Sequence, residues 1–231
     1  MPEKARSIRV VCATRLSQSA FLAQSLTGFS LRSFVPVSPI DLTLFPENSK
    51  GLAEVYNMAI GRFIDEDSIL VFVHDDVLFM DYHWADVVRR GLDTFGMVGI
   101  VGNTRRQKNQ PGWIVTDLGG RLDDYACLSG AVGQGNAFPP ERLDVFGPVG
   151  RECKLMDGLF LAIGTETLRT TGLRFDERFR FHFYDVDFCR EAERLGVSMG
   201  TIPLAVSHGS SGPLSQAWKE TYPLYLDKWK D

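Results

Sequence analysis

A histidine and two aspartates that directly follow an apolar run are the residues of this chain best suited to chemistry. The run covers residues 69–73 (Ile-Leu-Val-Phe-Val), and His74, Asp75 and Asp76 come next. Two carboxylates and an imidazole are costly to bury together without a cation, whereas Mg²⁺ or Mn²⁺ accepts carboxylate, water and phosphate oxygens at the same time. The cluster therefore predicts a site for a metal-bound phosphorylated substrate.

The apolar run indicates where in a fold this cluster lies. Residues 69–73 have the continuous hydrophobicity of a strand that is buried on both faces of a largely parallel sheet. Open α/β sheets bind their ligands at the carboxyl ends of their strands. The candidate ligands therefore stand at the edge of the sheet where a site is expected.

The first hundred residues alternate between strand and helix patterns. Strands are predicted over 8–13, 33–37, 69–73 and 97–101, and helices over about 17–26, 50–64 and 84–95. Asn48 and Ser49 are expected to cap the second of these helices. This alternation is typical of parallel βαβ units, so the predicted fold class is α/β with a mostly parallel central sheet flanked by helices. Neither GxGxxG nor GxxxxGK[ST] occurs, which argues against a dinucleotide site and a P-loop.

The second half of the chain has a different texture. Residues 112–150 are rich in Gly and Pro and are predicted as a long mobile loop, a lid or an acceptor-binding element. The elements predicted after it are a strand over 159–163, a helix from about 184 to Gly196, short strands over 198–202 and 204–207, and a helical tail. The Trp218 to Trp229 stripe of that tail is interpreted as a packing face.

Composition bounds the class of protein. The 231 residues are 44% hydrophobic and 23% charged, and we expect a single domain over 1–231 with a nucleotide-binding half over about 1–110 and an acceptor-binding half over about 111–231. The net charge of -4 argues against a nucleic-acid partner. Four cysteines without metal-ligand spacing, no signal peptide and no membrane-spanning stretch predict a cytoplasmic protein, compatible with peripheral attachment to the inner membrane.

Several short motifs, taken in their order along the chain, resemble those of family-2 type GT-A glycosyltransferases, above all the small bacterial group labelled glycosyltransferase-like. The motifs are Ala13-Thr14-Arg15, Ala53 and Asn57 before the acidic strand end, His74-Asp75-Asp76 in place of Asp-x-Asp, Asp157-Gly158, Phe175-Asp176-Glu177-Arg178-Phe179, Tyr184-Asp185-Val186-Asp187 and His208. The resemblance implies a Rossmann-like GT-A fold. It also implies transfer of a sugar from a nucleoside diphosphate sugar to a hydroxyl acceptor, with inversion at the anomeric carbon.

A metal site is part of what the resemblance implies. Asp76 would be the principal ligand of Mn²⁺ or Mg²⁺, and His74 stands where the first aspartate of Asp-x-Asp is usual. His208 matches a late histidine that supplies a further ligand or contacts the diphosphate. Chemistry agrees with this assignment, because a divalent cation stabilises the charge that builds on a leaving diphosphate by several kcal/mol.

The remaining candidates would bind the donor and the acceptor. Asp75, Thr14 and Arg15 are predicted to contact the nucleotide, and Asp157 is predicted to contact the acceptor, which would be a glycan, a lipid-linked sugar or a small molecule. Asp185 matches the aspartate that serves as catalytic base. A positioned carboxylate in that role is worth roughly 10²- to 10⁴-fold in rate.

Alternative interpretations accompany these assignments. Asp185 could instead cap its helix, and His208, just before Gly209, could be an ordinary loop residue. A metallohydrolase is a second possible enzyme class, and it would use His74, Asp75, Asp76, Asp185 and His208 around one or two ions. Because His74 and Tyr184 replace the usual Asp and Glu, a catalytically inactive sugar-nucleotide or glycan-binding module is a third hypothesis.

Overall fold

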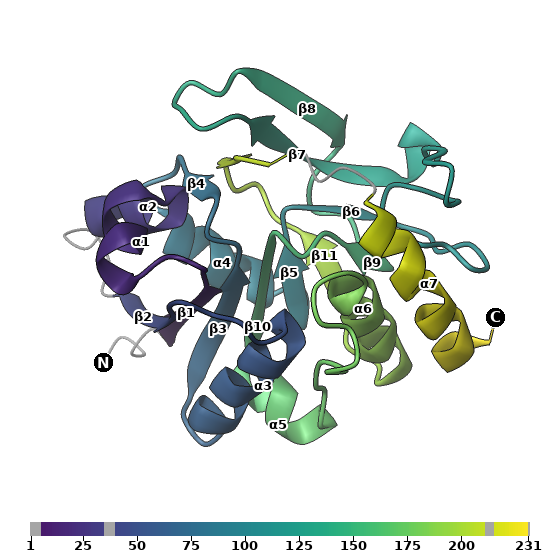
Figure 1. Cartoon of the computed structure of the whole chain (residues 1–231), viewed down its shortest axis with the longest axis horizontal. Coiled ribbons are helices and arrows are strands. Elements are labelled where there is room, and N and C mark those ends of the chain that lie inside the picture. The colour runs from purple at the N-terminus through teal and green to yellow at the C-terminus, as the bar shows by residue number, and fades with distance from the viewer. Residues whose placement is uncertain (1–5, 35–39, 211–214, 231) are drawn as a thin grey trace.

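Two β-sheets with helices around them form the fold (Figure 1). The computed structural model describes residues 6–34, 40–210 and 215–230. The first sheet has the order β11 (Met199–Thr201), β5 (Met97–Gly99), β10 (Phe160–Gly164), β3 (Ser68–Val73), β1 (Ser7–Ala13) and β2 (Ile40–Phe45). The second has the order β4 (Val77–Phe79), β12 (Val206–His208), β7 (Leu128–Gln134), β6 (Val101–Asn103) and β9 (Leu155–Met156), with β8 (Arg142–Gly147) paired to β7.

Strand β3 is the buried centre of the first sheet, as its apolar run predicts. All six of its residues are buried. Strands β2, β1 and β3 are parallel neighbours, and β5 and β11 are parallel to each other, whereas β10 runs antiparallel between β3 and β5. The predicted α/β class with a mostly parallel sheet is confirmed, and β10 is the antiparallel strand within it.

Seven α-helices surround these sheets in the part of the chain that the structure describes. They are α1 (Gln18–Gln24), α2 (Leu26–Phe34), α3 (Leu52–Phe63), α4 (Trp84–Leu92), α5 (Thr165–Thr171), α6 (Tyr184–Arg194) and α7 (Gln216–Trp229). A single 3₁₀ turn, Tyr125–Cys127, precedes β7.

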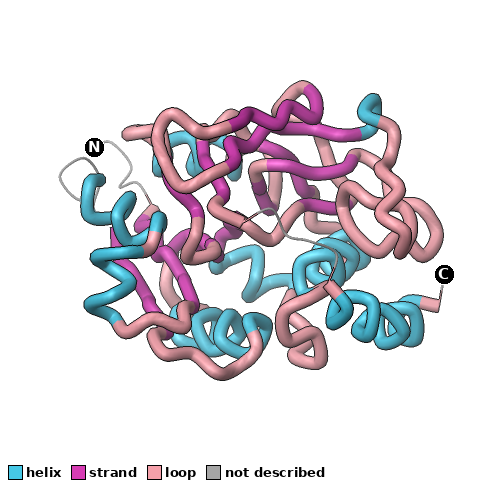
Figure 2. Tube along the Cα trace, turned by 45° about the horizontal axis from the view of Figure 1, so that its top comes forward, coloured by secondary structure: helices cyan, strands magenta, loops and turns pink. Residues whose placement is uncertain are grey.

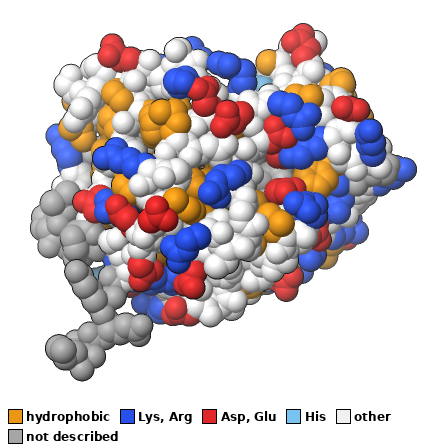
Figure 3. Space-filling model, turned by 90° about the horizontal axis from the view of Figure 1, so that it is seen from below, with side chains coloured by type: hydrophobic (Ala, Val, Ile, Leu, Met, Phe, Trp, Pro, Cys, Tyr) orange, Lys and Arg blue, Asp and Glu red, His pale blue; other side chains and the backbone are white. Residues whose placement is uncertain are grey.

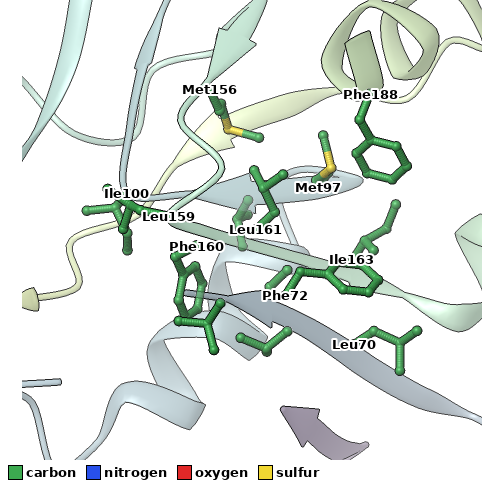
Figure 4. Close-up of a cluster of buried hydrophobic side chains, with 14 of the residues drawn as sticks. Leu70, Phe72, Met97, Ile100, Met156, Leu159, Phe160, Leu161, Ile163 and Phe188 are labelled. Carbon is green, nitrogen blue, oxygen red and sulfur yellow. The ribbon is translucent and has the colours of Figure 1, made fainter. Parts of the chain in front are cut away.

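Helices cover both faces of the first sheet. On one face Tyr56 of α3 contacts Phe72 at a ring distance of 4.7 Å, and Phe72 and Leu161 lie opposite each other in the β3–β10 ladder. On the other face Phe160 packs on Phe79, which contacts Trp84 of α4. Figure 4 shows the alternation directly, with Leu161 and Phe160 pointing to opposite sides of β10. Because both faces are covered, β3 can be apolar throughout and still end in polar residues at the sheet edge.

The second sheet contains the segment that sequence reasoning interpreted as a loop. Residues 112–150 include the antiparallel pair β7 and β8, so the prediction of a long mobile loop is wrong where these strands lie, while a role in acceptor binding stays a prediction. In Figure 1 the hairpin lies at the top, away from α3 and α5, and Figure 2 shows the strands of this sheet gathered above the helices. The predicted strand over 97–101 divides at Ile100, because β5 and β6 belong to different sheets.

Two local predictions near the N-terminus are also wrong. Of the strand predicted over 33–37, the first two residues end helix α2, and residues 35–39 lie outside the described residues. Helix α3 is capped by Gly51, while Asn48 forms a turn in which its Oδ1 accepts from the backbone N–H of Lys50. By contrast, the helix predicted over about 17–26 is present in part as α1, and Ser17 caps it, since its hydroxyl accepts from the backbone N–H of Ala20.

Charge of both signs is interspersed over the face seen from below in Figure 3. Among the described residues, no helix combines the length and the apolar character needed to cross a bilayer.

Candidate active site

A cavity of about 780 Å³ gathers most of the predicted site residues. It lies where the ends of β1, β3 and β12 approach the start of α6 and the β7–β8 pair. The predicted residues that line it are His74, Asp75, Asp76, Asp157, Asp185 and His208. Thr14 contacts one of these residues, whereas Arg15 is exposed and does not line the cavity, so its contact with a nucleotide stays a prediction.

Three of the lining residues form a group with the spacing of a metal site. One ligand atom each from His74, Asp76 and His208 lie within 4.8 Å of one another. His208 Nε2 is 3.3 Å from Asp76 Oδ1, and the two imidazole rings are 5.7 Å apart between centroids. Two imidazoles and one carboxylate form a donor set that suits divalent first-row metals, Mn²⁺ among them. The residues present therefore fit Mn²⁺, one of the two predicted ions, better than Mg²⁺, which prefers oxygen ligands.

The pKa shifts of Asp76 and His74 favour the binding of a cation by this group. Burial would raise the pKa of Asp76, but the hydrogen bond and positive charge of His208 outweigh burial and lower it to about 2. Burial, followed by the charge of His208, lowers the pKa of His74. These shifts favour the ionised form of Asp76 and the neutral form of His74, which are the forms that bind a metal ion. Burial would lower the pKa of His208, but its hydrogen bond to Asp76 outweighs burial and raises it, so an ion bound here would displace a proton from His208.

Backbone contacts fix the strand end that carries the ligands. Thr27, at the start of α2, donates its hydroxyl to the carbonyl of His74 at 2.6 Å and accepts from the N–H of Val77 at 3.2 Å. The N–H of Gly209 donates to the carbonyl of Asp76 at 2.8 Å, which ties the end of β12 to the end of β3. Sequence reasoning missed Thr27, which is completely buried 47 residues before His74.

Thr14 orients the middle residue of the acidic strand end. Its hydroxyl donates to Asp75 Oδ2 at 2.6 Å, and its backbone N–H donates to Phe45 at the end of β2. The two predicted nucleotide contacts, Thr14 and Asp75, thus touch each other where β1 and β3 end side by side.

Asp185 faces the cavity from the first turn of α6. Its Oδ2 accepts from the backbone N–H of Gly158 at 3.0 Å. Burial and the nearby carboxylate of Asp157 raise the pKa of Asp185 to about 7. Phe183 occupies the N-cap position, so Asp185 stands in the first turn of the helix and not at the cap, and its carboxylate interacts with backbone N–H groups of that turn. A carboxylate with a pKa near neutrality is well matched to accepting a proton.

A strained backbone conformation sets the direction of Asp185. Phe183 has φ 65°, in the left-handed region that a bulky residue rarely adopts. Its ring is buried, stacks on Trp218 of α7 at 5.6 Å and packs at a tilt against Tyr225 at 5.1 Å. Packing by α7 therefore stabilises the turn from which Tyr184 and Asp185 project.

Asp157 is held by two donors at the edge of the cavity. The indole N–H of Trp113 donates to its Oδ2 at 2.6 Å, and the backbone N–H of Leu159 donates to its Oδ1 at 2.8 Å. Trp113 lies within residues 112–150 and is buried. Its role in holding Asp157 was not visible in the sequence.

One wall of the cavity consists of residues that sequence reasoning did not single out. Arg142, Asp144 and Phe146 line it from alternate positions of β8. Arg142 donates to Asp144 at 2.7 Å, and Gln134 of β7 donates to the same carboxylate at 3.0 Å. The period-two spacing of these residues is the signal that could have found them.

Asp187 has a structural role. It is completely buried and accepts from Lys228 at 2.9 Å and from the Trp229 indole at 2.9 Å, both on α7. The tail is therefore mainly a packing element, as predicted, although Trp218 also lines the cavity.

Comparison with known proteins assigns the family. Residues 40–211, which is more than half of the chain, match the model of the "Glycosyltransferase like family". The chain belongs to this family. Among curated proteins, no sequence matches this glycosyltransferase-like chain.

Solved structures show the fold of this glycosyltransferase-like protein. It is similar to GalNAc-T7, solved with UDP, GalNAc and Mn²⁺, with a TM-score of 0.55 and 11% identity over 99% of this chain and 49% of that chain. It is also similar to S. aureus TarS (TM-score 0.48, 10% identity, 88% of this chain and 60% of that one) and to A197 from STIV (0.47, 14%, 89% and 86%). The likeness to GalNAc-T7 is one of fold, and the fold is GT-A. This chain spans about half the length of GalNAc-T7.

Proposed function

We propose that this glycosyltransferase-like protein is a metal-dependent enzyme that moves a sugar from a nucleoside diphosphate sugar to a hydroxyl acceptor. The observation that carries the proposal is the convergence of His74, Asp76, His208 and Asp185 on one cavity. Membership of the family supports sugar transfer. GalNAc-T7, which has the same fold, was solved with UDP, GalNAc and Mn²⁺.

The donor would be held at the ends of β1 and β3. His74, Asp76 and His208 would hold Mn²⁺ or Mg²⁺, which when bound supplies positive charge against the leaving diphosphate. Asp75, oriented by Thr14, has a second carboxylate oxygen that would accept from a nucleotide hydroxyl. The metal ligands would thus serve the diphosphate, and Asp75 would bind the nucleoside.

Asp185 would take the proton of the acceptor. As the acceptor oxygen forms its bond to the anomeric carbon, the bond from that carbon to the diphosphate oxygen breaks, and the hydroxyl proton passes to the Asp185 carboxylate. A single displacement of this kind inverts the anomeric centre. Asp157 lies close enough to raise the pKa of Asp185 and would bind the acceptor from the same side.

The arrangement favours this proposal over a phosphoester hydrolase that uses two ions, and the assays below separate it from a hydrolase that uses one. A hydrolase with two ions needs two sets of ligands, and among the described residues one group of three ligands is present. The second carboxylate of the strand end, Asp75, is not part of that group because it accepts from Thr14. The donor set fits one ion.

A thermal-shift screen of nucleoside diphosphates tests the proposal. We expect UDP or GDP to raise the melting temperature of the protein in the presence of Mn²⁺ and much less in EDTA, because a ligand that binds only the folded state stabilises it. Asp76→Ala should abolish the Mn²⁺-dependent part of the shift. Asp67→Ala is the matched control, since Asp67 is exposed and immediately precedes the same strand.

The outcomes separate the three hypotheses. A nucleotide shift that is unchanged in Asp76→Ala would contradict the metal site. Release of phosphate from simple esters without any nucleotide would favour the hydrolase. Donor hydrolysis or transfer that Asp185→Asn removes would exclude the inactive binding module.

A further inference from the structure

Two residues that depart from the expected acidic pattern contact each other. His74 stands in the metal group, and Tyr184 opens helix α6, 110 residues later in the chain. The His74 Nε2 and the Tyr184 hydroxyl oxygen are 2.8 Å apart. The two departures are therefore one structural feature.

The direction of this hydrogen bond follows from the second partner of the hydroxyl. Tyr184 donates to the carbonyl oxygen of Gly158 at 2.9 Å. A phenolic hydroxyl has one proton, so towards His74 its oxygen must accept. The Nε2 of His74 consequently carries the proton, and the lone pair of the neutral ring is on Nδ1.

We propose that Tyr184 is a positioning residue that fixes His74 in the Nε2–H tautomer and so reserves Nδ1 for the metal ion. The inference rests on the proposed function, because it assigns a role to Tyr184 within that metal site. Metal-binding histidines generally donate their other ring N–H to a fixed acceptor, which sets the tautomer and the ring orientation. Here the acceptor is a tyrosine oxygen.

The surroundings of Tyr184 hold its hydroxyl in place. The residue is 3% exposed, and its ring packs against Tyr56 at 5.9 Å and Phe175 at 6.1 Å. Gly158 permits the close approach, since a Cβ there would overlap the Tyr184 hydroxyl and lie 2.6 Å from its Cζ. The carbonyl of Gly158 therefore fixes the tyrosine proton, and the tyrosine oxygen in turn fixes the imidazole.

A neutral acceptor also affects the charge of the site. With Tyr184 as the partner of His74, the three ligands contribute one negative charge in total, from Asp76, when both imidazoles are neutral. A divalent ion bound there would keep a net positive charge, which favours binding of a diphosphate. A carboxylate at position 184 would accept the same hydrogen bond but would cancel that charge.

Two measurements on Tyr184→Phe test the inference. The first is ¹⁵N NMR of the histidine side chains in the metal-free protein, which reports the protonated ring nitrogen and is tractable because the chain has 4 histidines. The second is calorimetric titration with Mn²⁺ alone. Tyr56→Phe is the matched control, because the Tyr56 hydroxyl is buried in the same aromatic cluster and has no hydrogen-bond partner among the described residues.

We expect His74 to be the Nε2–H tautomer in the parent protein and in Tyr56→Phe, and a mixture of tautomers in Tyr184→Phe. Mn²⁺ should bind Tyr184→Phe about 10-fold more weakly than the other two proteins, while the melting temperatures confirm that all three are folded. An unchanged tautomer, or an unchanged Mn²⁺ affinity, in Tyr184→Phe would overturn the inference and leave the metal site intact. A parent protein that does not bind Mn²⁺ would overturn the proposed metal site and the role of Tyr184 with it.

Discussion

Two carboxyl groups of the same cavity have pKa values that are shifted in opposite directions. They belong to Asp76 at the end of β3 and Asp185 at the start of α6. Burial favours the neutral form of both, yet the imidazole of His208 lowers the pKa of Asp76 to about 2, whereas burial and, after it, the charge of Asp157 raise the pKa of Asp185 to about 7. One group is thus a permanent anion and the other can exchange a proton near neutrality. Environments that separate the pKa values of two carboxylates in this way are typical of a division of labour in an active site.

Replacing the proposed proton acceptor is expected to have the largest effect, because it removes the function of one carboxylate and leaves the other. Asp185→Asn keeps an oxygen that can accept from Gly158 but cannot take a proton, so we expect sugar transfer to fall by at least about 10²-fold. Binding of Mn²⁺ and nucleoside diphosphate should be unchanged, because in the proposed arrangement those ligands would contact the other side of the cavity. Steady-state transfer assays measure the first effect, and calorimetry measures the second. A loss of nucleotide binding in this variant would contradict the proposal that proton transfer and nucleotide binding are carried by different residues.

Gly158 connects the two sides, since its N–H binds Asp185 and its carbonyl binds the tyrosine that holds His74. A Cβ at this position would lie 2.8 Å from the Asp185 Cβ. We expect Gly158→Ala to lower the free energy of unfolding by roughly 1–3 kcal/mol through overpacking and to weaken both Mn²⁺ binding and transfer.

Chemical denaturation measures the stability effect of Gly158→Ala. Gly61→Ala in α3 is the control, because a Cβ there meets nothing within 4 Å and alanine favours a helix. A Gly158→Ala variant as stable and active as the Gly61→Ala variant would show that the connection is unimportant.

The smallest expected effect is a pH dependence of stability. The pKa of Asp185 is raised on folding from about 3.9 in an unfolded chain, so its protonated form stabilises the fold fully below that value and the contribution is lost as pH rises through about 7. At pH 8, Asp185→Asn should therefore be more stable than the parent, on the order of 1 kcal/mol after allowing for solvent in the cavity. Urea unfolding in EDTA at pH 5 and pH 8 checks this, and the gain should shrink at the lower pH.

The end of β3 and the start of α6 also show how much of the site could be predicted from the sequence. The acidic end of β3 and the acidic start of α6 were both predicted, because a buried strand and an amphipathic helix have clear hydrophobic periods. Their convergence with His208 was a hypothesis that the geometry supports, since Asp76, Asp185 and His208 line one cavity. One possible ligand atom each from His74, Asp76 and His208 also lies within 4.8 Å of the others. Local pattern was sufficient for these elements.

Other parts of the site were not accessible in this way. The cavity wall on β8 was missed because Gly and Pro around it suggested a loop, although Arg142 and Asp144 alternate as a strand requires. The contact of His74 with Tyr184 joins residues 110 positions apart, and the bond of Thr27 to the β3 end depends on helix α2, which the sequence did not indicate. Long-range hydrogen bonds depend on tertiary packing and leave no periodic signal.

A crystal structure of the protein with Mn²⁺ and UDP, with the ion located by its anomalous scattering, would test the assignment of the metal ligands and of the proton acceptor together. We expect the ion to be bound to His74, Asp76 and His208, and Asp185 to lie in the same cavity but not to be bound to the ion. An ion bound by Asp185 and Asp157 instead, with Asp76 left paired to His208, would contradict this assignment.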